Sequence, residues 1–98
     1  MNLRGKVAIV TGAGGGVGKA TTKRLAQEGC KVVLIGRDRS KLAKVTAEIK
    51  DSKNTLPISA DITKEAEVLS AVEQTISAYD TVDILVNNTM PLTVISSM

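Results

Sequence analysis

The decisive stretch of this sequence runs Val7-Ala8-Ile9-Val10-Thr11-Gly12-Ala13-Gly14-Gly15-Gly16-Val17-Gly18. Its consecutive Val and Ile residues indicate a buried strand. The glycines that follow allow a tight turn and a close approach of the backbone to a ligand. The helical pattern after them directs free N–H groups and the positive end of a helix dipole at the same point. A strand, a glycine turn and a helix N-terminus together predict a pyrophosphate-binding site.

Outward from this stretch, short apolar runs alternate with longer helical patterns. We expect strands at residues 6–11, 31–35, 56–60 and 82–87, and helices at residues 17–28, 39–50 and 64–79. Alternation of this kind, with strands of Val, Ile and Leu, is typical of a parallel sheet wound with right-handed crossovers. The expected fold is α/β: a three-layer half Rossmann fold, whose sheet has four parallel strands in the order 3-2-1-4.

Single residues predict how these elements begin and pack. The apolar face of the first helix is expected to carry Val17, Ala20, Thr21 and Leu25. Pro57 suits an edge strand, where its missing N–H does no harm. Thr63 is a candidate N-cap for the third helix. The interpretation of Cys30 is a small buried residue rather than a reactive thiol.

The composition excludes several classes of function. The 98 residues include no His and one Cys, so a zinc site and an intrachain disulfide are not expected. The net charge of +3 is scattered, and the single aromatic residue offers no stacking surface, which argues against nucleic acid as a partner. The polar start, Met1 to Lys6, does not resemble a signal peptide, and no segment is long enough to span a membrane. We therefore expect a cytoplasmic protein.

Three further features lie in register with the glycine stretch. They are Gly36-Arg37-Asp38 after the second strand, Asp61-Ile62 after the third and Asn87-Asn88 at the end of the fourth. With them, the sequence resembles the short-chain dehydrogenase/reductase family, in the style of bacterial 3-oxoacyl-carrier-protein reductases. Residues 11–18 match the family pattern TGxxxGxG, and residues 82–88 resemble its fourth strand and NNAG motif. The resemblance, over residues 3–88, implies an NAD(P)-binding half-domain at 1–88 and a divergent tail at 89–98.

A dinucleotide site is what this resemblance implies. The glycine turn would cradle the cofactor through Gly12, Gly14, Gly15, Gly16, Val17 and Gly18. Asp61 would contact the adenine amino group with Ile62 against the ring; the alternative for Asp61 is a cap ahead of the third helix. Asn88 would lie beside the cofactor ribose, while Asn87 would hold neighbouring strands together.

The end of the second strand favours NADP over NAD. NAD-dependent Rossmann proteins place an acid there to bond the ribose 2′-OH. The family register puts that acid at position 36, which is Gly36, and Asp38 is expected to start the next helix instead. Arg37 follows directly, with Arg39 close by, and a guanidinium suits a 2′-phosphate. Against this, position 15 is Gly15, where some NADP-dependent members carry a basic residue.

The family's catalytic residues have no counterpart in this sequence. Hydride transfer in the family needs a Tyr-xxx-Lys pair with a Ser, but Tyr79 is the only tyrosine, and Asp83 stands four residues later. Tyr79 is expected to pack at a helix end. Thr89 and Met90 stand where NNAG has Ala and Gly. We therefore predict a truncated NADP-dependent oxidoreductase with no catalytic and no metal-binding residues. A frameshift, a premature stop or an alternative end would each explain it.

Two alternatives stay open from the sequence. If the fourth strand ends the sheet, its free edge invites pairing with another chain. The chain would then form a homo-oligomer, or act as an interaction module that pairs with itself or with a full-length paralogue. Alternatively, a second polypeptide that carries the Ser, Tyr and Lys would complete a working oxidoreductase.

Overall fold

The computed structural model describes residues 3–49, 52–88 and 93–96. The elements in chain order are β1 (Val7–Thr11), α1 (Gly16–Gln27), β2 (Lys31–Gly36), α2 (Arg39–Glu48), the 3-10 helix η1 (Ser52–Asn54), β3 (Thr55–Ser59), α3 (Glu65–Tyr79), β4 (Ile84–Asn87) and β5 (Thr93–Ser96). Each helix and strand predicted from the sequence is present, within two residues at either end.

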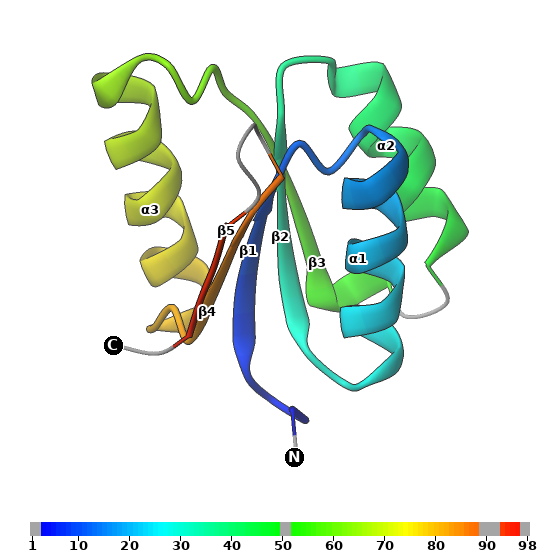
Figure 1. Ribbon diagram of the computed structural model, residues 1–98. Helices are drawn as coiled ribbons and strands as arrows, with labels where there is room; N and C mark the ends of the chain where they lie inside the picture. Colours follow the sequence, from blue (N-terminus) through cyan, green and yellow to red (C-terminus); the bar gives the residue numbers. More distant parts are fainter. Residues whose placement is uncertain (1–2, 50–51, 89–92, 97–98) are drawn as a thin grey trace.

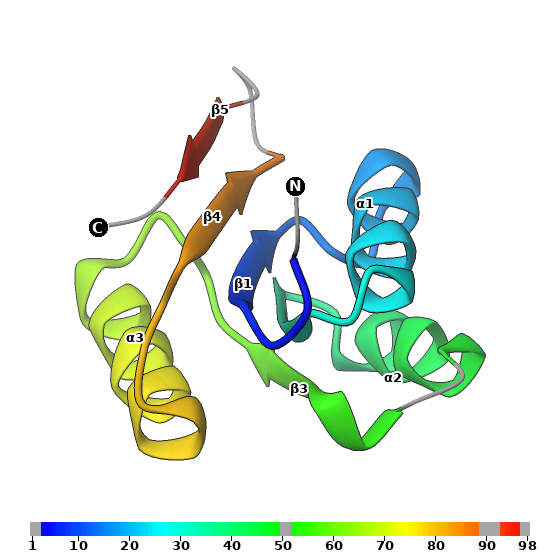
Figure 2. The ribbon, with the colours of Figure 1, turned by 90° about the horizontal axis from the view of Figure 1, so that it is seen from below.

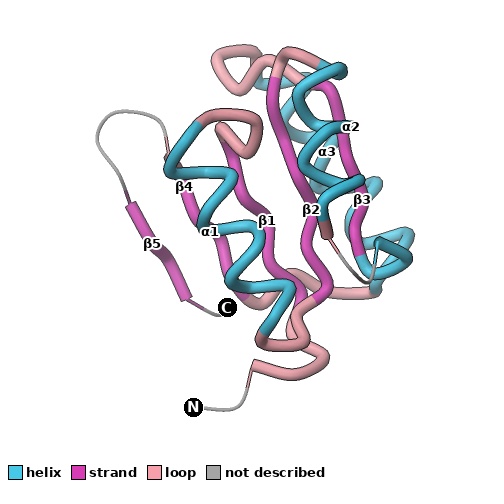
Figure 3. The backbone as a smooth tube through the Cα atoms, turned by 90° about the vertical axis from the view of Figure 1, so that its right-hand side faces the viewer, coloured by secondary structure: helices cyan, strands magenta, loops and turns pink. Residues whose placement is uncertain are grey.

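The sheet has the predicted parallel arrangement and one strand more. Its order is β3-β2-β1-β4-β5, so the four parallel strands follow the order 3-2-1-4 (Figure 1). The fifth strand lies beside β4 (Figure 3). It runs antiparallel to β4, with Asn87 opposite Thr93 and Ile84 opposite Ser96. The expectation of an open edge at β4 is therefore wrong. The returning strand covers that edge and pairs the backbone groups that would otherwise face another chain.

Helices cover the sheet on both faces, which gives three layers. Figure 2 shows α1 and α2 on one side and α3 on the other. All five residues of β1 are buried, since side chains of alternating direction enter one layer or the other. Toward α1 and α2 the core includes Val10, Leu34 and Leu42. Toward α3 it includes Ile9 and Val33.

The first helix packs through small residues rather than through its apolar stripe. Val17 is 64% exposed, whereas Gly18 and Thr22 are buried. A Cβ placed on Gly18 would lie 1.9 Å from the carbonyl oxygen of Gly12. The backbone of α1 therefore packs directly against the backbone of the preceding turn, with no room for a side chain at this position. The predicted buried face of α1 is wrong at Val17 and Ala20 for this reason. Both side chains point away from the contact.

The starts of α2 and α3 differ in how they are capped. Asp38 caps α2, and its carboxylate accepts hydrogen bonds from the backbone N–H groups of Ser40 and Lys41, at 3.0 and 3.3 Å. Its predicted place at the start of this helix is thereby confirmed. Thr63 is not the cap of α3: that helix is preceded by Lys64, whose side chain makes no capping bond.

Three other sequence predictions are confirmed. Pro57 lies on β3, an edge strand of the sheet, and its side chain is exposed. Cys30 is buried, and desolvation raises the pKa of its thiol. Tyr79 ends α3 and packs against the core on that face. In the described ranges, no helix combines the length and the apolar character needed to cross a membrane.

Candidate functional site

The glycine turn joins β1 to α1 at the carboxyl edge of the parallel strands. Gly12 adopts φ +64°, a left-handed conformation that other residues rarely take. The turn is fastened by the Ala13 N–H, which donates to the Ile35 carbonyl at 3.2 Å, and by the Gly15 N–H, which donates to the Gly12 carbonyl at 3.2 Å. Its backbone is therefore held against β2 while Gly15 and Gly16 stay exposed.

The start of α1 has no side-chain cap. Its N-cap residue is Gly15, and no side chain of the described residues bonds the first N–H groups, in contrast to α2 with its Asp38 cap. Uncapped N–H groups at a helix start carry partial positive charge and bind anions. The exposed residues Gly16 and Val17 therefore offer N–H donors to a phosphate group, whereas the Gly15 N–H is used within the turn.

A hydrogen-bond network around Thr11 joins the ends of β1 and β4. The Thr11 hydroxyl donates to Asn87 Oδ1 at 3.0 Å and lies 3.4 Å from the Val86 carbonyl oxygen. It also accepts from the Asn88 N–H at 3.1 Å. Asn88 Nδ2 donates to the Thr11 carbonyl at 3.0 Å. These bonds fix both asparagines beside the glycine turn and confirm that Asn87 links neighbouring strands.

Asn88 has an acceptor left over at this point. Its Nδ2 is used by Thr11, which orients the amide, and its Oδ1 is buried without a donor among the described residues. A buried acceptor without a partner costs roughly 1–3 kcal/mol. A Cβ on Gly12 would lie 3.3 Å from the Asn88 Cβ, so Asn88 packs directly beside the turn. A ligand hydroxyl would satisfy it.

Asp61 and Arg37 face each other at the ends of β3 and β2. The Asp61 carboxylate accepts from the backbone N–H and the hydroxyl of Thr63, at 2.9 and 2.6 Å. These hydrogen bonds hold the pKa of Asp61 below its usual value, and the charge of Arg37, 4.0 Å away, lowers it further. Asp61 thus stabilises the turn before α3 and still presents a charged oxygen to Arg37.

The second strand ends at a glycine and not at an acid. Gly36 is the last residue of β2, as the register required, and a Cβ there would lie 3.2 Å from Leu42 Cδ2. Asp38 lies two residues further on, and its Oδ1 accepts both N–H groups at the start of α2. Arg37 follows the strand with a side chain that is 79% exposed.

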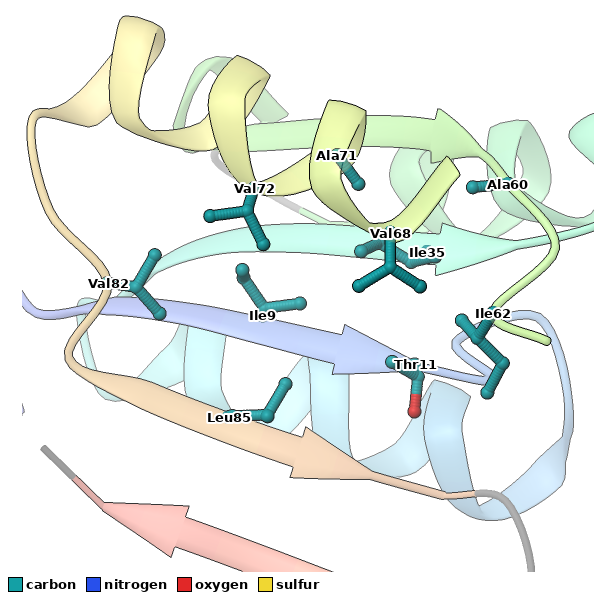
Figure 4. A pocket seen from close by; sticks show the side chains of 10 residues that line it. All are labelled: Ile9, Thr11, Ile35, Ala60, Ile62, Val68, Ala71, Val72, Val82 and Leu85. Carbon is teal, nitrogen blue, oxygen red and sulfur yellow. The ribbon is translucent and has the colours of Figure 1, made fainter. Parts of the chain in front are cut away.

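An apolar cavity of about 180 Å³ lies between α3 and the sheet (Figure 4). Ile62 lines it near the carboxyl edge, close to Thr11 (Figure 4). The other lining residues come from three strands and from α3 and the segments that flank it: Ile9, Ile35, Ala60, Val68, Ala71, Val72, Val82 and Leu85. The Ile62 side chain therefore offers an apolar surface beside the turn, while Asp61 offers charge.

The family model of short chain dehydrogenases matches residues 6–92. The chain belongs to this family. An uncharacterized oxidoreductase of Staphylococcus saprophyticus is 43% identical to it over 90 residues, which cover 90% of the chain and 38% of that relative. The chain thus spans well under half the length of this relative.

Solved short-chain dehydrogenases share the fold. A 3-ketoacyl-(acyl-carrier-protein) reductase of Brucella melitensis, complexed with NADH, is 48% identical with a TM-score of 0.78; the match covers 85% of this chain and 33% of the reductase. An actinorhodin polyketide ketoreductase with NADPH is 31% identical with a TM-score of 0.79, over 85% of this chain and 32% of that one. The oxidoreductase family and its NAD(P)-binding fold are therefore confirmed for this chain.

The structure brings the predicted site residues of this chain to one edge of the sheet. Within the described residues no cluster of acidic or sulfur ligands could hold a metal ion. Sequence reasoning missed Thr11 as the centre of the asparagine network. Its position directly before Gly12 at a strand end is the signal that could have found it.

Proposed function

We propose that this chain binds a nicotinamide dinucleotide at the glycine turn and prefers NADP to NAD. The observation that carries the preference is the end of β2, where Gly36 leaves no acid and Arg37 presents an exposed guanidinium. Asp38, the nearest acid in the sequence, is engaged by the N–H groups of α2. Solved relatives carry NADH in one case and NADPH in another, so the choice depends on this chain's own residues.

The described residues fit such a ligand. The uncapped start of α1, with Gly14, Gly15, Gly16 and Val17, would hold the pyrophosphate. Asn88 Oδ1 would accept from a ribose hydroxyl, which removes a buried acceptor without a partner. Asp61 and Ile62 would hold the adenine. When bound, the cofactor would supply hydride chemistry through its nicotinamide ring.

Replacing Arg37 by Asp should reverse the cofactor preference. The change removes a cation that suits the 2′-phosphate and adds an acid that can bond a ribose 2′-OH. One charge-assisted contact is worth roughly 1.5–3 kcal/mol, so the affinity for NADP should fall about tenfold or more. Calorimetric titration of both dinucleotides measures this. Equal affinities for the two, unchanged by the substitution, would contradict the charge argument; Arg24→Asp on α1 serves as a control for net charge.

The same chain should show no dehydrogenase or reductase turnover by itself. Its sequence has no Tyr-xxx-Lys pair and no His that could exchange a proton with a substrate. The assay uses purified protein with NADPH and a panel of ketones and acetoacetyl thioesters. Turnover that follows the protein through further purification would overturn this expectation. Activity that arises only with a second polypeptide supplying the Ser, Tyr and Lys would instead support a divided enzyme.

The alternative of an interaction module loses its structural basis at β4, because β5 already pairs with that strand. Formation of a homo-oligomer stays a prediction, as does the cytoplasmic location. Sedimentation of the full chain and fractionation of cells test these two predictions separately.

A further inference from the structure

Lys41 of α2 packs its side chain over the glycine turn. A Cβ built on Gly14 would lie 3.0 Å from the Cβ of Lys41 and 3.7 Å from its Cδ. The stem of this lysine therefore passes directly across the bare backbone of Gly14. The Lys41 N–H also donates to Asp38 at 3.3 Å, which fixes where the side chain leaves the helix.

The two lysines of α1 near this turn are engaged elsewhere. Lys19 and Lys23 on α1 both pair with Glu48 at the end of α2. Arg39, which the sequence placed near the cofactor, lines a separate cavity with Pro57 and Ser59 of β3. No ion pair to the Lys41 ammonium occurs within the described ranges, and the side chain is exposed. Of these three lysines, Lys41 is thus the one whose ammonium group is not paired with a carboxylate among the described residues, so it can bind an anionic ligand.

We propose that Lys41 is a second specificity-determining residue for the 2′-phosphate of NADP, in addition to Arg37. The inference rests on the proposed function and deepens it. Arg37 directly follows β2 and Lys41 lies in the first turn of α2, so both cations belong to the segment that follows the strand end where the ribose of the dinucleotide would lie. Lys41 would supply, from α2, the positive charge that Gly15 does not supply within the turn.

Gly14 permits this arrangement. Its φ is not in the left-handed region, so a substitution there acts through contact and not through backbone strain. A side chain at position 14 would meet Lys41 at 3.0 Å and push its stem away from the turn. The position of the Lys41 side chain over the turn therefore depends on the absence of a side chain at Gly14.

The test compares Lys41→Gln with Lys44→Gln in the full chain. Lys44 is exposed on the same helix and carries the same charge. Kd values for NADP and NAD are measured by calorimetry, with circular dichroism as a check of folding. Lys41→Gln should weaken NADP binding about fivefold and change NAD binding less than about twofold, the size of one exposed charge contact. Lys44→Gln should change neither, and Lys41→Arg should retain the preference.

The outcomes separate this inference from the proposed function. If the unaltered chain prefers NADP but Lys41→Gln leaves its ratio of Kd values unchanged, only the role of Lys41 is wrong. An equal loss for both dinucleotides would likewise overturn a role in specificity. If the unaltered chain binds both equally, or neither, the proposed function fails and this inference fails with it.

Discussion

Replacing Gly18 by Ala is expected to unfold most of the protein. The added Cβ would lie 1.9 Å from the Gly12 oxygen, 2.6 Å from its carbonyl carbon and 2.9 Å from the Ala13 Cα. All three are backbone atoms, so no side chain can rotate to make room. Overpacking of a core commonly costs about 1–3 kcal/mol, and a backbone clash of this depth should exceed it. A chain of this length has only roughly 5–15 kcal/mol of stability in total.

Gly16→Ala is the matched control for this change. A Cβ on Gly16 meets nothing within 4 Å, and the position begins α1. Alanine there should leave the free energy of unfolding unchanged or raise it by up to about 1 kcal/mol, since alanine favours helix more than glycine does. Urea unfolding followed by circular dichroism gives both values. Similar midpoints for the two variants would refute the close packing of α1 on the turn.

Thr11→Val should be the most damaging isosteric change at the site. Valine keeps the shape but removes the hydroxyl that serves Asn87 and Asn88. Two partly buried groups would each lose a hydrogen bond, at roughly 1–3 kcal/mol each, so we expect a loss of about 2–6 kcal/mol of stability. Because the ends of β1 and β4 would be joined by fewer hydrogen bonds, dinucleotide affinity should fall as well.

Thr75→Val provides the comparison. Thr75 is equally buried, but its hydroxyl only donates to the Ala71 carbonyl one turn earlier in α3. Its loss should cost less than about 1 kcal/mol and leave dinucleotide affinity unchanged. Denaturant unfolding and calorimetric titration of both variants test the difference. If Thr75→Val lowers stability and affinity as much as Thr11→Val does, the hydrogen bonds at the ends of β1 and β4 do not contribute more than an ordinary buried hydroxyl.

The parallel sheet could be predicted because its central strands, β1 and β2, are buried on both faces and therefore consist largely of Val, Ile, Leu and Ala. The polar residues at strand ends were equally readable, since Asp38 and Asn87 stand where a regular element stops. For such residues, the side-chain type and the position in the sequence are enough to predict the structural role. The register of Gly36, by contrast, came from the resemblance to the family.

Other features depend on contacts that a linear pattern does not show. β5 has four residues, too few to reveal a period, and its place depends on an edge left by β4. The buried face of α1 consists of Gly18 and Thr22, because the distance between helix and turn, not hydropathy, decides which side chains fit. Thr63 bonds to Asp61 rather than to the helix that follows it. The lysine over Gly14 is Lys41 of α2, and no pattern in the sequence indicates that it contacts the glycine turn.

The bonds between Thr11 and Asn88 also determine when a ligand site can exist. They join residues 77 positions apart, so the site closes one of the longest loops in the chain. Closing such a loop costs more conformational entropy than pairing β1 with β2, which are close in the sequence. A nascent chain that ends before β4 would hold a glycine turn without its asparagines. A dinucleotide that touches both sides would stabilise the closed form by mass action, and cofactor supply would then influence how much of the protein escapes proteolysis.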